Sequence, residues 1–169
     1  MKVLGRCLWF AEKDKRVLRL GLLCVRNPMI VFVVWFLLLY FDAGGYMLVG
    51  LAVSFWHELG HILCWLVMFR SAPRLTVSVS GIALDVSWVS LSDGYRLILA
   101  AAGPAMNFLA AAWLYRTMDV RATVSAAAYW AANLLIGGFN LLPISPLDGY
   151  QILSAGWKFW SNKLLFRRE

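Results

Sequence analysis

The sequence predicts an all-α polytopic membrane protein with about four transmembrane helices and a small membrane-associated region of β-strands. Apolar residues make up 62% of the 169 residues, whereas about 45–50% is usual in soluble domains. This excess lies in a few long apolar stretches, and the positive charges gather at their ends. The net charge of +7 is therefore not one groove-sized basic patch, and we expect no nucleic-acid partner.

The first part of the chain predicts a basic segment and two spans. Residues 1–26 carry seven Lys or Arg among apolar residues, which indicates an amphipathic segment on an anionic membrane face, with a disordered basic tail as the alternative. Pro28 suits the first turn of a helix, so residues 29–41 form a short first span. After a turn at 42–45, residues 46–69 form a second span of about 36 Å, enough to cross roughly 30 Å of hydrocarbon.

The hydrophobic pattern changes after Arg70 from helical spacing to alternation. Apolar and polar side chains alternate from residue 75, and they alternate again in the opposite phase beyond Gly81. Period two is the spacing of a half-buried strand. The sequence therefore predicts two strands or a kinked ribbon at about 74–89.

The remaining apolar sequence predicts the last two spans. An alanine-rich stretch at 97–115 forms the third, and its small residues let neighbouring helices approach closely. The stretch at 122–157 is too long for one straight helix and holds Pro143 and Pro146. We expect a fourth span that is interrupted at about 142–147. The alternative is a fourth span followed by a short fifth one.

The distribution of charge predicts the orientation of these spans. A broken fourth span places the N-terminus and the basic C-terminal tail, residues 158–169, on the cytoplasmic side, as the positive-inside rule prefers. Two Arg in the link at 116–121 oppose this orientation. The chain is thereby divided into the basic segment 1–26, a membrane core at 27–157 and the basic tail.

The second span carries the sequence HELGH at residues 57–61, which contains both histidines of the chain. An ionised carboxylate at the centre of a span costs about 3 kcal/mol on insertion scales, so ionisable groups there indicate a functional site. His57 and His61 lie one turn apart on one helix face, where both can reach one Zn²⁺, and Glu58 can reach a water molecule beside it. The alternative is a set of polar contacts between helices that serves only packing.

Zinc needs a third protein ligand, and two residues are candidates. Cys64 shares the helix face of the histidines, but its sulfur begins about 10 Å along the axis from His57, too far for a short side chain. Asp148 follows the two prolines in NLLPISPLDGYQ, and irregular backbone at membrane depth is tolerated only where it is buried in protein or lines a cavity. Asp148 is therefore the better candidate, with a helix-capping role as the alternative.

Three motifs in this order resemble the site-2 protease family of intramembrane zinc metalloproteases. They are HELGH, GPAMN at 103–107 and NLLPISPLDG at 140–149, and they lie within the core at roughly 27–157. The resemblance is closest to the small bacterial branch related to the sporulation-factor processing protease. The family pattern implies a packing or supporting role for Asn107.

The same resemblance implies a role for each residue of the site. The ligands of one Zn²⁺ per chain are His57, His61 and Asp148, and Glu58 is the general base and acid. Asn140 matches an asparagine near the active site that is implicated in substrate handling. The implied activity is hydrolysis of a peptide bond in or near a transmembrane segment of a membrane-bound protein. The implied partners are this substrate, the lipid of a bacterial cell membrane and a membrane regulatory protein.

Two other functions are open alternatives: a non-proteolytic membrane metal-binding protein, such as a transporter, and a scaffold without activity. Transporters usually show paired repeats, whereas this sequence has one broken segment and no repeat. A scaffold has no need of Glu58 beside all three ligands. Both alternatives are therefore weaker than proteolysis.

The predicted strands at 75–88 suggest how a substrate binds. An extended segment could add to the edge of these strands through backbone hydrogen bonds. On this hypothesis a proline at Val77 or Val79 reduces cleavage more than it reduces zinc content.

Overall fold

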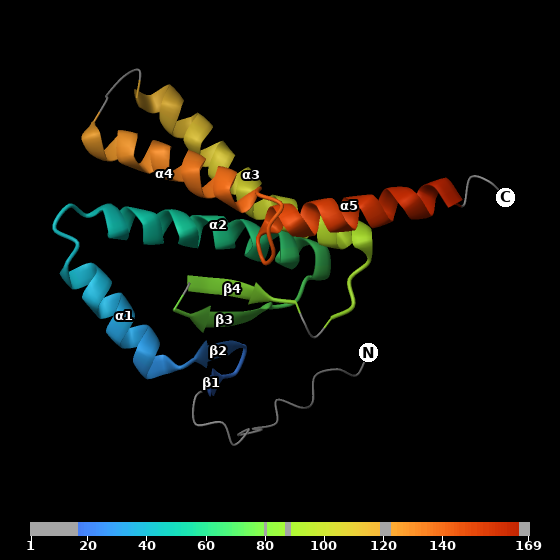
Figure 1. The fold of residues 1–169 in the computed structure, drawn as a ribbon, viewed down its shortest axis with the longest axis horizontal. Helices are drawn as coiled ribbons and strands as arrows, with labels where there is room; N and C mark the ends of the chain where they lie inside the picture. Colours follow the sequence, from blue (N-terminus) through green and yellow to red (C-terminus); the bar gives the residue numbers. More distant parts are fainter. Residues whose placement is uncertain (1–16, 80, 87–88, 119–122, 166–169) are drawn as a thin grey trace.

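The computed structural model describes residues 17–79, 81–86, 89–118 and 123–165. Its elements follow in the order β1 (Val17–Leu20), β2 (Leu23–Arg26), α1 (Pro28–Tyr40), α2 (Tyr46–Phe69), β3 (Arg74–Ser78), β4 (Gly81–Asp85), α3 (Asp93–Met118), α4 (Val124–Asn140) and α5 (Asp148–Leu165). Figure 1 shows α2 to α5 lying together, with the sheet beside α2 and with α1 apart from α3, α4 and α5. The predicted fold class, mostly helical with a small sheet, is confirmed.

The expected helices occur close to their predicted bounds. α2 covers the second predicted span, α1 begins at Pro28, and α3 contains all of the third predicted span. Glycines allow α2 and α3 to pack closely, because a Cβ at Gly60 would lie 2.5 Å from the carbonyl oxygen of Ala102 and 2.7 Å from Cγ of Met106. This close packing of α2 against α3 places HELGH next to the GPAMN segment.

A four-stranded sheet lies beside α2, in the order β1-β2-β3-β4. β1 and β2 are antiparallel, β2 and β3 are parallel, and β3 and β4 are antiparallel. β3 and β4 are the two strands expected at 74–89. The sheet order leaves β4 at the edge, and Figure 1 shows this edge facing α2.

The hairpin of β1 and β2 differs from the sequence expectation for the segment 1–26. Residues 1–16 lie outside the described part of the chain, and residues 17–26 form two strands that the sequence did not predict, while the membrane-surface location of the segment stays a prediction. Leu20 pairs with Leu23 across a two-residue turn, in which Gly21 has a φ of 63°. A positive φ at the first turn position is what glycine supplies in a tight hairpin. The hairpin then extends the sheet through the parallel pairing of β2 with β3.

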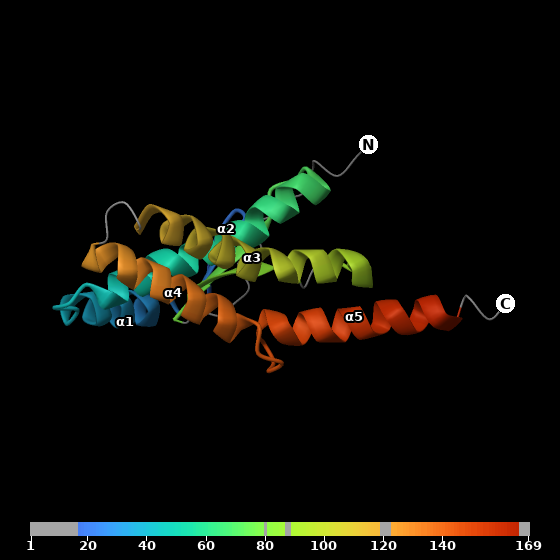
Figure 2. The same ribbon diagram turned by 90° about the horizontal axis from the view of Figure 1, so that it is seen from above.

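The predicted interruption of the last apolar stretch separates α4 from α5. α4 ends at Asn140, and α5 begins at Asp148 after the two prolines. A Cβ at Gly149 would overlap the carbonyl oxygen of Leu141, so the chain turns back tightly on itself here. α5 continues to Leu165, beyond the expected end at 157. Figure 2 shows α5 alongside the first half of α3.

Large apolar side chains cover the outside of the helices. Among the most exposed are Phe32, Tyr40, Val67, Leu109, Trp113, Val124 and Leu135. Soluble monomers rarely expose contiguous apolar patches larger than a few hundred Å². Within the described residues, α2 and α3 are long and apolar enough to cross a membrane, and α1 is a shorter apolar helix. This surface suits lipid, while the number of crossings stays a prediction.

Candidate metal centre

Three predicted ligands, His57, His61 and Asp148, meet between α2 and the first residue of α5. Nε2 of His57 lies 3.0 Å from Oδ2 of Asp148, and Nε2 of His61 lies 3.3 Å from the same oxygen. The two Nε2 atoms are 3.2 Å apart. His57 is 4% exposed and His61 is 6% exposed, so the centre lies inside the helix packing. We call these residues the metal triad.

The geometry of the metal triad fits a zinc ion. Ligand atoms that are each about 2.0–2.1 Å from a tetrahedral zinc lie about 3.3 Å from one another. The three donor distances of 3.0, 3.2 and 3.3 Å match this spacing. Two imidazole nitrogens and one carboxylate oxygen are a donor set of catalytic zinc sites, which keep a fourth position for water or substrate.

Cys64 lies outside the triad, as the sequence predicts. Among the described residues, the group whose ligand atoms come within 4.8 Å of one another contains the three triad residues and no cysteine. The Cys64 thiol instead lies 3.3 Å from the sulfur of Met68, one turn further along α2. Helix geometry alone was thus sufficient to exclude this residue.

A backbone carbonyl fixes the ring of His61. Nδ1 of His61 lies 2.8 Å from the carbonyl oxygen of Leu99 in α3, so this nitrogen is protonated and donates a hydrogen bond to the carbonyl. A neutral imidazole has one protonated nitrogen, so Nε2 keeps its lone pair facing the other two ligands. Such a contact sets both the tautomer and the orientation of a metal ligand.

Asn107 of the GPAMN segment lies behind the ring of His57. It is 0% exposed, its Nδ2 is 3.3 Å from Nδ1 of His57, and its Oδ1 is buried with no partner among the described residues. A half-turn of the amide exchanges these two atoms. Oδ1 then accepts a hydrogen bond from the Nδ1–H of His57, which leaves Nε2 free for a metal. The contact places Asn107 where it could position His57, and the supporting role expected for it stays a prediction.

Gly103 in the same segment makes room for the triad. A Cβ at this position would overlap Nε2 of both His57 and His61. Only glycine therefore lets α3 pass this close to the two ligands. The sequence motif contains this glycine, but its contact with the histidines depends on how α2 and α3 pack.

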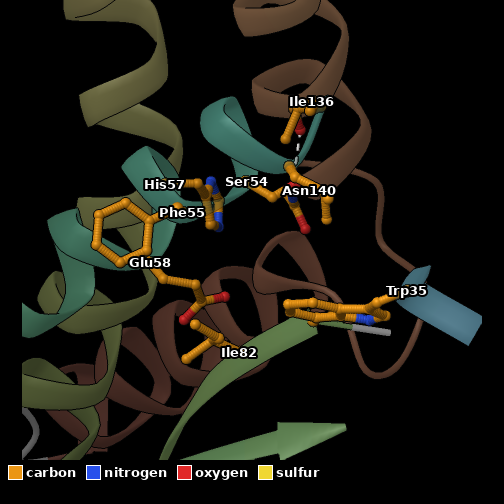
Figure 3. Close-up of a pocket in the computed structure, with 10 residues that line it drawn as sticks. Trp35, Ser54, Phe55, His57, Glu58, Ile82, Ile136 and Asn140 are labelled. Atoms are coloured by element: carbon orange, nitrogen blue, oxygen red, sulfur yellow. Dashed lines mark hydrogen bonds between the residues drawn. The ribbon is translucent and has the colours of Figure 1, made fainter. Parts of the chain in front are cut away.

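Glu58 lies where two cavities meet. The larger, about 290 Å³, is lined by Trp35 and is drawn in Figure 3; we call it the Trp35 cavity. The smaller, about 180 Å³, contains all three triad residues, and we call it the Asp148 cavity. His57, Glu58 and Asn140 border both. Glu58 is thus next to the triad without belonging to it, which suits a general base.

Asn140, the last residue of α4, lies between the two cavities. Its Nδ2 donates to the carbonyl oxygen of Ile136 at 3.0 Å, which holds the amide at the cavity wall. Figure 3 shows the side chains of Asn140, Glu58, Trp35 and Ile82 pointing toward one common space. Substrate handling by Asn140 stays a prediction. Trp35 was not identified from the sequence, because nothing in its apolar neighbourhood distinguishes it from the other eight tryptophans.

Comparison with known proteins identifies the fold. No protein-family model matches the chain, and no curated protein matches it in sequence. The structure is similar to the site-2 protease from Methanocaldococcus jannaschii, with a TM-score of 0.58 and 19% sequence identity. The match covers 83% of this chain and 69% of that protein. The chain therefore has the fold of a site-2 protease, with a buried His–His–Asp triad at its centre.

Proposed function

We propose that this protein is an intramembrane zinc metalloprotease that cleaves a membrane-bound protein in or near a transmembrane segment. One observation carries the proposal: the metal triad has the donor spacing of a zinc site and lies beside Glu58 within helices that are apolar outside. The likeness in fold to a site-2 protease supports it. The proposed relationship to the small bacterial branch of that family rests on the three sequence motifs alone.

The proposed location is a bacterial cell membrane, with several crossings and with cytoplasmic termini. The exposed apolar side chains and the lengths of α2 and α3 support lipid surroundings. The orientation rests on the positive-inside rule. Lipid, a membrane-protein substrate and a membrane regulatory protein are the proposed partners.

The chemistry follows from the groups around the triad. A zinc ion held by His57, His61 and Asp148 would supply Lewis-acid activation of a water molecule and of the scissile carbonyl. Glu58 takes a proton from the attacking water and later delivers it to the leaving amine. The C–N bond breaks, the C–O bond forms, and both protons of the water end on the products.

The edge of β4 is the surface for an extended substrate. The N–H of Leu75 donates to the carbonyl oxygen of Leu22, so Leu75 directs its backbone groups toward β2. Leu84 is paired with Leu75, so its own backbone groups point away from β3, toward the cavities. Period two gives Ile82 the same direction. A substrate strand on this edge would lie beside the triad.

This geometry changes the test that the sequence suggested. Val77 lies in β3, which pairs with a strand on each side, so a proline there would break the sheet. Ile82→Pro instead removes an outward N–H from an edge strand. We expect the cleavage rate of Ile82→Pro to be roughly 2- to 10-fold lower than that of Ile82→Ala, because about one backbone hydrogen bond to the substrate is lost. The two variants should contain equal amounts of zinc. Equal cleavage by the two variants would count against strand addition.

Removal of the metal tests the proposed function directly. The purified protein is reconstituted with tagged single-span membrane proteins, its zinc is stripped with a chelator, and cleavage and metal content are measured together. We expect cleavage to stop in the metal-free protein and to return when Zn²⁺ is added, but not with Mg²⁺. Cleavage that persists in protein shown to be metal-free would contradict the proposal. Zinc binding without cleavage of any candidate would favour the non-proteolytic alternative.

A further inference from the structure

We propose that the Trp35 cavity is a specificity subsite that receives a bulky apolar side chain of the substrate next to the scissile bond. This inference rests on the proposed proteolytic function. His57, Glu58 and Asn140 line this cavity and belong to the sequence motifs, but Trp35 and the other lining residues lie outside all three motifs.

The position of the cavity assigns it to one side of the scissile bond. It borders His57 and Glu58 but neither His61 nor Asp148, whereas the Asp148 cavity contains the whole triad. The reacting carbonyl must lie at the triad and near Glu58, where the two cavities meet. A substrate that extends from there along β4 passes Gly81 and Ile82, which line the Trp35 cavity. One neighbouring substrate side chain can therefore enter it.

The size and lining of the cavity define which side chain fits. Its volume of about 290 Å³ exceeds the roughly 150 Å³ that suffices to hold a benzene ring. Aromatic and aliphatic walls come from Trp35, Phe55 and Ile136, and polar groups come from Ser54 and Asn140. A charged side chain would lose its hydration in this cavity. Glu58 is the one Asp, Glu, Lys or Arg among the lining residues, so little charge is present to compensate for that loss. Leucine, phenylalanine and methionine fit this description.

Trp35 sets the width of the subsite. Its Nε1–H donates to the carbonyl oxygen of Val79 at 3.3 Å, in the turn between β3 and β4. This bond restrains the indole ring. Figure 3 shows the ring on the opposite side of the cavity from Ser54. Trp35 reaches the cavity from α1, which lies apart from α3, α4 and α5, so the size of its ring limits the width of the cavity on this side.

The test alters the cavity by substitution and measures which substrate side chains near the cleavage site are preferred. A single-span substrate is prepared with Ala, Leu, Phe, Trp or Asp at each of three positions on either side of its mapped cleavage site. The parent protein should prefer Leu or Phe over Ala at one position by about 10- to 200-fold, the usual discrimination of an apolar pocket. Leu51→Trp fills the cavity and should reverse this preference at that position alone. Leu48→Trp, on the exposed side of the same helix, should keep the parental profile.

Two further variants distinguish the effect of the size of the Trp35 ring from the effect of its hydrogen bond to Val79. Trp35→Ala enlarges the cavity and should admit a substrate Trp that the parent cleaves poorly. Trp35→Phe keeps an aromatic wall without the donor and should retain the preference for Leu and Phe over Ala. Zinc content, measured for each variant, shows that the centre has formed.

The outcomes distinguish the subsite from the proposed function. If Leu51→Trp and Trp35→Ala keep zinc, cleave the substrate and show the parental preference, the subsite assignment is wrong, and the proposed proteolytic function is unaffected. If the zinc-loaded parent cleaves no member of the panel, the proposed function is overturned and the subsite with it. A reversed profile in Leu51→Trp, absent in Leu48→Trp, supports the assignment.

Discussion

Glu58→Gln is expected to lower the rate of substrate cleavage by about 10²- to 10⁴-fold, the usual contribution of a general base. Glutamine has nearly the same shape as glutamate but cannot take a proton from water. Glu58 borders both cavities and is absent from the metal triad, so the variant should still bind one zinc. Cleavage of a reconstituted single-span substrate and zinc stoichiometry, measured on the same preparation, check both expectations.

A matched exchange away from the site serves as the control. Asp93→Asn at the start of α3 also replaces a carboxylate with an amide, and Asp93 lines neither cavity. It should leave both cleavage and zinc unchanged. Parental cleavage by Glu58→Gln would show that another group moves the proton. Loss of zinc from this variant would place Glu58 among the ligands instead.

The second large effect is expected from Gly103→Ala, which adds one methyl group against the triad. Its Cβ would overlap Nε2 of His57 and of His61, so either the rings or the helices must move. Loss of a residue that only hydrogen-bonds to a metal ligand already lowers metal affinity by about 10–100-fold. Displacement of two ligands should reach about 100-fold or more. Competition with a chelator of known zinc affinity measures this without any substrate.

Two other glycine-to-alanine changes provide the comparison. A Cβ at Gly50 in α2 or at Gly138 in α4 meets nothing within 4 Å. Both variants should keep parental zinc affinity, and alanine should make each helix more stable by up to about 1 kcal/mol. If Gly103→Ala bound zinc as tightly as these two controls, the close approach of α3 to the histidines would not matter for the metal.

The features predicted correctly from the sequence are those with a local signal. The histidines of HELGH are four residues apart on one helix, and this spacing alone brings them together. The alternation around Gly81 predicted β3 and β4. The two prolines predicted the break before Asp148, and the break is what turns this carboxylate toward α2. Each of these inferences needed only a short stretch of chain.

The features that the sequence did not reveal depend on packing between distant segments. The hairpin at 17–26 has one glycine as its signal, inside a basic segment that also suited a membrane surface. The parallel pairing of β2 with β3 has no local signal, because Leu23 and Leu75 lie on either side of two helices. The position of Trp35 at a cavity wall likewise follows from that sheet, through its bond to Val79.

The separation of the triad along the chain has a consequence for biosynthesis. His57 and Asp148 are 91 positions apart, and the carboxylate opens the last described helix. A nascent chain in which α5 has not yet been synthesised contains both histidines and Glu58 but lacks Asp148, the third proposed ligand. Metal affinity of such a site arises only as the fold is completed. If the proposed function holds, the order of synthesis delays peptide-bond hydrolysis until α5 has been made and has packed into the fold.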